Sequence, residues 1–278
     1  EGWYVCVLNA LPFSVISSSI AIPSAAGMRP HDREFVIYES SFSDIIGIVV
    51  FDFVLFNDTV TSKSFLVLGF DIGSIALISV VFCLALLWLM GNIKHHIKFF
   101  LIMSVLVMVY AIAKQFHLSS LIIVLAFGLL LNNAQRLRHP VFASIFHYEK
   151  LPADLDQMKT LTAESAFLIR TFFFLLFGYS IVLSNLGSLR VLALGGFIIA
   201  AIYFGRIAMM ALVAPEERAA IQLIAPRGLI SILLFFSIPE AHAHLLVGNG
   251  VLFVVILCTS LIMSYGLVRG KKKEVAEA

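Results

Sequence analysis

Residues 38–53 read YESSFSDIIGIVVFDF, and this stretch decides how the chain can fold. From Ile45 onward it is apolar enough to lie in hydrocarbon, yet Asp44 lies in the middle of the segment. An ionisable group near the bilayer centre costs about 2.5 to 3.5 kcal/mol on insertion scales, which favours a functional role. Ser40 lies one turn before Asp44 on the same helix face, and a hydroxyl beside a carboxylate suits a small cation with oxygen ligands.

The composition of the whole chain indicates a lipid environment. Of 278 residues, 60% are hydrophobic and 13% are charged, whereas about a quarter of the residues in a soluble domain are charged. Apolar runs of about 20 residues, long enough to cross a bilayer, recur from Trp3 to Val268. The net charge of +2 is small and dispersed, so nucleic-acid binding is set aside.

Proline, glycine and charge clusters divide these runs into helices. We predict an all-α polytopic membrane protein with about nine transmembrane helices. The predicted spans are residues 3–27, 34–57, 65–92, 97–113, 118–132, 161–184, 189–212, 217–238 and 246–268.

The predicted helices form two halves joined by a polar segment. Residues 1–132 are the first half and contain the ion-site helix, and residues 161–270 are the second half. Between them, residues 133–160 are expected to form an amphipathic linker on the cytoplasmic surface. Residues 271–278 are the expected cytoplasmic tail.

Lys and Arg in alternate loops predict the orientation, because cytoplasmic loops carry the excess. Thirteen fall on one side: Arg29, Arg33, Lys94, Lys98, Arg136, Arg138, Lys150, Lys159, Arg218, Arg269, Lys271, Lys272 and Lys273. The other side has three, Lys63, Lys114 and Arg190. We therefore expect a plasma (inner) membrane protein whose carboxyl terminus is cytoplasmic.

Two predicted helices, one in each half, contain an interruption. Pro23 lacks the amide that would continue the first helix, and Pro226 does the same in the eighth. The expected helix breaks are Ser19, Ile22, Pro23, Pro226 and Gly228. One broken helix in each half indicates a transporter with inverted repeats and a site at the membrane midplane. The alternative is a pair of ordinary proline kinks.

Charged side chains inside the spans need partners. Glu39 lies about 140° around the helix from Asp44, so it faces a different neighbour. We predict that it forms a structural ion pair with Arg227, next to the second break. Arg206 is expected to reach the cytoplasmic interface. For Asp44 itself, the alternative is a buried structural acid paired with an arginine.

Together these elements resemble the monovalent cation/proton antiporter superfamily, the sodium/proton exchangers. Residues 39–44 are similar to the family pattern Glu-Ser-x-x-Asn-Asp, and residues 226–228 resemble its later Arg-Gly element. Residues 126–132 and 173–180 are also typical of the family. The resemblance implies a cation/proton-binding site at Asp44, Ser43 and Ser40, the Glu39–Arg227 pair, and an elevator-like core that moves past a dimerisation domain.

The chain departs from the family pattern at two places. The family's Thr-Asp-Pro is Ala21, Ile22 and Pro23 here, and its Asn, or the second Asp of its electrogenic members, is Ser43. A single carboxylate at that paired position favours electroneutral exchange. The match begins at the family's first crossing helix, so we expect the first few helices of such a fold to lie upstream, with a homodimer in the full-length form.

We therefore predict a secondary active transporter that exchanges sodium or potassium for protons by alternating access, with no enzymatic activity and no cofactor. A sodium-coupled solute symporter and a degenerate, non-transporting membrane subunit remain alternatives. An intramembrane aspartyl protease would need two carboxylates in one site, such as Asp44 and Asp71, and the Gly-x-Gly-Asp pattern is missing. The three cysteines, Cys6, Cys83 and Cys258, lack the spacing of a metal site.

Overall fold

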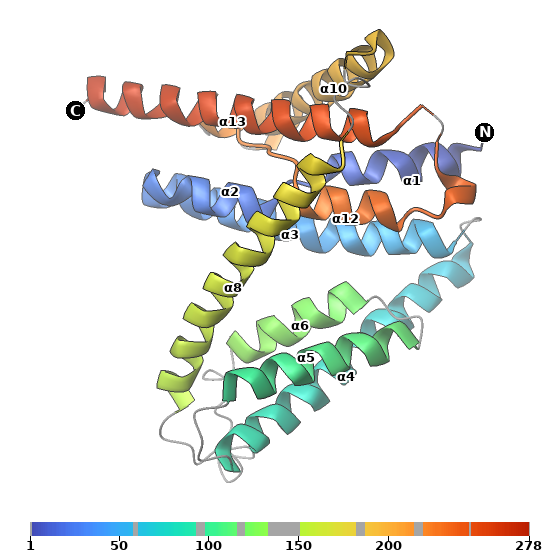
Figure 1. The fold of residues 1–278 in the computed structure, drawn as a ribbon, viewed down its shortest axis with the longest axis vertical. Coiled ribbons are helices and arrows are strands. Elements are labelled where there is room, and N and C mark those ends of the chain that lie inside the picture. Colours follow the sequence, from blue (N-terminus) through green and yellow to red (C-terminus); the bar gives the residue numbers. More distant parts are fainter. Residues whose placement is uncertain are drawn as a thin grey trace. The chain divides into compact units, whose positions relative to one another are not determined.

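The computed structural model describes residues 2–57, 61–92, 98–115, 120–132, 151–181, 187–213, 219–244 and 246–277. These described residues form helices and contain no strand (Figure 1). The longer helices are α3 (Pro30–Phe56), α4 (Ser62–Asn92), α5 (Lys98–Gln115), α6 (Ser120–Asn132), α8 (Leu151–Tyr179), α10 (Leu189–Val213) and α13 (Asn249–Glu277). The shorter ones are α1 (Trp3–Ser14), α2 (Ser18–Ser24), η1 (Ala25–Gly27), α11 (Ala219–Gln222), α12 (Leu229–Ser237) and η2 (Glu240–His242).

Five segments of the described chain are long and apolar enough to cross a membrane: Trp3–Gly27, Ser62–Phe82, Thr160–Tyr179, Leu189–Leu212 and Asn249–Gly270. The ion-site helix α3 is not among them. It contains Glu39, Asp44 and Asp52, more charged residues than the other five segments carry over a comparable length. The number of membrane crossings therefore stays a prediction.

Two helices extend beyond their predicted ends. α8 begins at Leu151, so residues 151–160 of the expected linker are helical, and residues 133–150 lie outside the described residues. α13 continues to Glu277 through most of the expected tail. Both extensions are rich in residues that favour a helix, such as Ala, Leu, Lys and Glu, and Pro152 is tolerated in the first turn.

The chain divides into two compact units. Unit 2 comprises Thr59–Thr171, and in it α6 packs against α4 and α5 around the buried Ile75, Val109 and Ile123. Unit 1 comprises Glu1–Asp58 and Phe172–Ala278.

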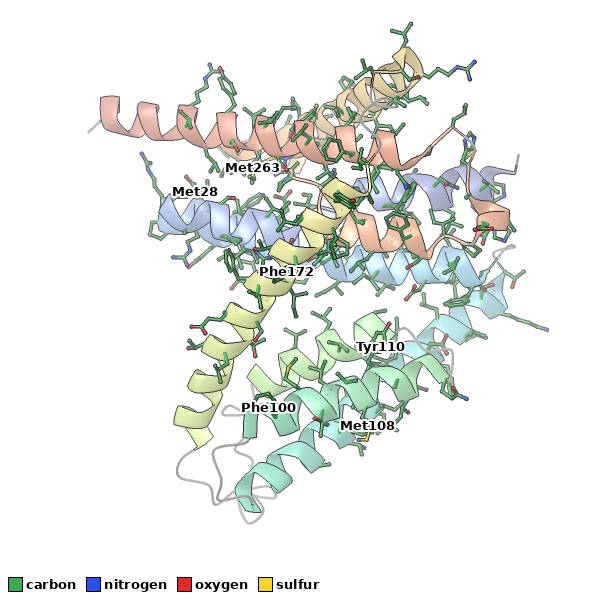
Figure 2. The ribbon with its side chains drawn as sticks, viewed as in Figure 1. Met28, Phe100, Met108, Tyr110, Phe172 and Met263 are labelled. Carbon is green, nitrogen blue, oxygen red and sulfur yellow. The ribbon has the colours of Figure 1, made fainter. Side chains whose placement is uncertain are left out.

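In unit 1, two segments far apart in the sequence pack together. α1 lies against α3 and α12, α2 lies against α3, and α13 lies against α10 and α11 (Figure 1). One apolar cluster contains Ile16, Tyr203, Ile224 and Met263, with Met28 packed against it; both methionines are labelled in Figure 2. This cluster surrounds the points where the first and eighth predicted helices are interrupted.

The outer surface of α10 is strongly apolar. Phe197, Phe204 and Leu212 are between 73% and 84% exposed. Large apolar side chains with this exposure suit contact with lipid or with another apolar surface.

Candidate cation-binding site

The first helix is interrupted at residues 15–17, between α1 and α2. Other elements satisfy the freed amides. Ile16 N donates to Ser43 Oγ of α3 at 2.9 Å, and Ser17 N donates to the carbonyl of Pro226 at 2.8 Å. A backbone amide in an apolar surrounding needs such a partner, so these two hydrogen bonds stabilise the interruption.

This interruption lies earlier than predicted. Ser19, Ile22 and Pro23, the expected break residues, lie within α2. Pro23 is the sixth of the seven residues of α2, so its missing amide removes a hydrogen bond only near the helix end. The chain departs from helical geometry where tertiary partners for its amides exist, and proline alone does not mark that place.

The second interruption covers residues 223–228, between α11 and α12, and contains Pro226 and Gly228. Its backbone is held from two sides: the Pro226 carbonyl accepts from Ser17, and Arg227 N donates to Thr259 Oγ1 of α13 at 3.1 Å. A Cβ at Gly228 would lie 2.7 Å from both Ser17 Oγ and Ile20 Cδ1. The two interruptions are therefore in direct contact, and a side chain at position 228 would require Ser17 and Ile20 to shift.

Asp44 of α3 faces the first interruption. Ser18 Oγ donates a hydrogen bond to Asp44 Oδ2. Asp44 Oδ1 is buried and has no hydrogen-bond partner among the described residues. Gly47, almost one turn further along α3, packs so closely on Val15 that a Cβ there would overlap it. One carboxylate oxygen is thus committed to a hydroxyl, and the other is open to a proton or a cation.

Ser43 and Ser40 of α3 form hydrogen bonds with backbone groups, whereas Ser18 binds the carboxylate of Asp44. Ser43 Oγ accepts the amide of Ile16, which holds the first interruption. Ser40 is buried, and its hydroxyl donates to the carbonyl of Val36 in its own helix at 2.7 Å. The hydrogen-bond partner of the carboxylate is Ser18, which is not among the predicted site residues. Its only signal was the run of three serines at positions 17–19.

Glu39 forms an ion pair with Arg206 of α10. The predicted partner was Arg227, so this prediction is wrong. Arg206 Nη1 lies 2.6 Å from Glu39 Oε1, and Nη2 lies 2.8 Å from Oε2. The same guanidinium donates from Nε to the carbonyl of Gln222 at 2.9 Å and from Nη2 to that of Ile221 at 3.0 Å. Its side chain is 7% exposed, so Arg206 does not reach the interface as expected. The sequence placed both arginines within predicted spans, but it predicted a buried ion pair only for Arg227, because spacing along the chain does not show which arginine reaches α3.

Arg227 is also buried, at 4% exposure, and lies within electrostatic range of Arg206, Tyr203 and Glu39. Its Nε and Nη1 atoms have no hydrogen-bond partner in the described part of the chain. The hydroxyl of Tyr203 lies 3.4 Å from the carbonyls of Leu223 and Thr259. The second interruption thus has two arginines beside it, and in the described part of the chain only Arg206 has an acceptor for each of its three guanidinium nitrogens.

Comparison with known proteins agrees with this architecture. The family model described as sodium/hydrogen exchanger, transmembrane, matches residues 2–269. This match includes both interruptions, Asp44 and the Glu39–Arg206 pair, and it confirms the resemblance and the all-α membrane class predicted from the sequence. No curated protein matches the chain. The match covers nearly the whole chain, and the protein therefore belongs to the sodium/hydrogen exchanger family of integral membrane transporters.

Proposed function

We propose that the protein exchanges a monovalent cation, sodium or potassium, for protons at Asp44. The observation that carries this proposal is the state of that carboxylate: Ser18 donates to one oxygen, and the other is buried with no hydrogen-bond partner among the described residues. A buried acceptor without a partner is unfavourable, so binding either a proton or a cation there is stabilising. Competition of the two for one oxygen supports exchange.

In this proposal Asp44 Oδ1 binds the cation directly and the hydroxyl of Ser18 is a further oxygen ligand. Ser43 acts mainly on the backbone, because it holds the amide of Ile16 next to the site. Ser40, which the family pattern also associates with the site, contributes through its position on the buried face of α3. Backbone carbonyls at the two interruptions, Pro226 and Gly228 included, are further candidates to complete the coordination.

The exchange is proposed to be electroneutral. Asp44 is the acid that faces the interruptions, and Glu39 is already neutralised by Arg206. With a proton or a cation bound the carboxylate is neutral, whereas the unloaded carboxylate carries a charge whose transfer through a low-dielectric region is unfavourable. Only the loaded forms then alternate between outward and inward access, so one cation moves for each proton. The crossing interruptions support an inverted-repeat core.

The orientation and assembly belong to the same proposal. Thirteen basic residues against three support a cytoplasmic carboxyl terminus in the plasma (inner) membrane. The family resemblance supports a homodimer.

Cation-driven proton movement in proteoliposomes tests this function. The full chain should acidify or alkalinise the lumen when a sodium or potassium gradient is imposed, and an imposed membrane potential should leave the initial rate unchanged. Asp44→Asn should abolish the exchange, whereas Asp52→Asn, the same change further along α3, should retain it. Exchange that persists in Asp44→Asn would overturn the assignment of the site.

Two other outcomes have distinct meanings. Solute uptake driven by a sodium gradient, without proton movement, would indicate a symporter. A wild-type chain that binds lipid normally but moves neither protons nor solute would indicate a non-transporting subunit.

A further inference from the structure

The guanidinium of Arg206 joins three elements of unit 1. It is held on α10, it binds both carboxylate oxygens of Glu39 on α3, and it donates to the last two carbonyls before the second interruption, those of Ile221 and Gln222. A guanidinium has five N–H groups, and the described contacts use four of them. Few side chains could serve an acid and two carbonyls from one planar group.

The two carbonyls lie where α11 ends. The last carbonyls of a helix lack intrahelical donors, and lipid offers none. Ile221 O also accepts from Ile224 N at 2.9 Å, while Gln222 O accepts from Arg206 Nε. A positive charge at this helix end also complements the partial negative charge of the carbonyls. Arg206 therefore stabilises the start of the second interruption independently of its ion pair.

From this guanidinium, two paths lead to Asp44. One runs through Glu39 and along the continuous helix α3, on which Glu39 precedes Asp44 by five residues. The other runs through residues 221–226 to the Pro226 carbonyl, which accepts from Ser17 N, and then to the adjacent Ser18, whose hydroxyl binds Asp44. The two paths form a closed loop. A change at Arg206 is thus expected to alter the distance between Ser18 and Asp44.

We propose that Arg206 is a positioning residue for the cation site: by holding the end of α11 and the helix α3 with one group, it sets the approach of Ser18 to Asp44. Its hydrogen bonds go to Glu39 and to two carbonyls, so it acts through them and does not bind the cation. This inference rests on the proposed function. The proposed role goes beyond neutralisation of Glu39, which any positively charged side chain at position 206 could provide.

The test compares variants that separate the ion pair from the carbonyl contacts. Arg206→Lys keeps the charge but loses the planar fork. Glu39→Gln removes the ion pair but leaves the carbonyl contacts. The double variant Glu39→Arg with Arg206→Glu restores an ion pair but places a carboxylate against the carbonyls of Ile221 and Gln222. Arg190→Lys, at an exposed position of the same helix, is the matched control.

The readouts are the apparent KM and maximal rate of exchange in proteoliposomes, and the cation concentration that half-saturates thermal stabilisation of the purified protein. Arg206→Lys should raise the apparent KM and the half-saturating cation concentration by about tenfold. This is the lower end of the loss of affinity that follows removal of a group that orients a metal ligand. The maximal rate should change less. Glu39→Gln should have a smaller effect than Arg206→Lys, the charge swap should not rescue binding, and Arg190→Lys should match the wild type.

Three results would overturn the proposal. They are a charge-swap variant that restores the wild-type KM, an Arg206→Lys variant with wild-type KM, and a Glu39→Gln variant that loses more affinity than Arg206→Lys. If Arg206→Lys does not give monodisperse protein, Glu39→Gln and the charge swap still show whether Arg206 positions the site or only neutralises Glu39. If the wild type does not exchange, the proposed function fails, and the thermal-stabilisation concentrations alone then decide whether Arg206 positions the site.

Discussion

The amide of Ser17 donates to the carbonyl of Pro226 at 2.8 Å, and this hydrogen bond joins the two interruptions. Each interruption thus supplies the partner that the other lacks. Ser17 is followed by Ser18, which binds Asp44, and Pro226 is followed by the buried Arg227. The geometry at Asp44 therefore depends on both halves of the sequence.

The contact at Gly228 predicts a steric effect. Gly228→Ala should destabilise the protein by about 1 to 3 kcal/mol, because the new Cβ overlaps Ser17 and Ile20 in a packed region. Thermal unfolding of the purified protein measures this change. Gly196→Ala on α10, where a Cβ meets nothing within 4 Å, is the control and should leave stability unchanged or slightly raised. Equal effects of the two substitutions would contradict the contact.

Ser18 predicts an effect on cation affinity. Ser18→Ala removes the donor to Asp44 Oδ2, and a hydrogen bond to a charged group contributes about 1.5 to 3 kcal/mol. We expect a corresponding rise of the apparent KM, about 10-fold to 100-fold, while Ser18→Thr retains most of the affinity. Ser14→Ala, whose hydroxyl is exposed and bonds its own helix, should have no effect. A Ser18→Ala variant with wild-type KM would remove Ser18 from the site.

Ser43 and Ser40 should respond differently to the same substitution. Ser43→Ala leaves the amide of Ile16 without its acceptor, which costs about 1 to 3 kcal/mol of stability. Ser40→Ala removes only a bond to a carbonyl of its own helix, so we expect a smaller change in stability and an unchanged KM. Denaturation measures the change in stability, and exchange assays measure the KM. A loss of cation affinity in Ser40→Ala would show that Ser40 is a ligand, as the family pattern implies.

The two buried arginines should differ in their effect on folding. Arg206→Met leaves Glu39, whose side chain is 25% exposed, without its partner and removes a donor from two carbonyls, so it should destabilise the protein by about 1 to 3 kcal/mol. Arg227→Met removes a buried charge whose Nε and Nη1 have no acceptor in the described part of the chain, so stability should change little or rise. Melting temperatures of the two variants give the comparison. A larger loss of stability in Arg227→Met than in Arg206→Met would mean that Arg227 is the main partner of Glu39.

Most helix positions were predictable because the signal is local. Apolar length, proline, glycine and charge act within one segment, and they placed α3 and α10 to within a few residues. The ends of α8 and α13 were less predictable, since polar residues that favour a helix can extend it beyond the apolar run.

The sequence by itself determined that this is a helical membrane protein of the sodium/hydrogen exchanger family, and it singled out Asp44. A charge in an apolar helix stands out whatever the neighbours are. Only the tertiary structure decided that Ser18 binds Asp44, that Arg206 pairs with Glu39, and that the first interruption lies at residues 15–17. These features depend on which donors and acceptors meet across helices, and in an apolar surrounding the chain bends where its freed amides find those partners.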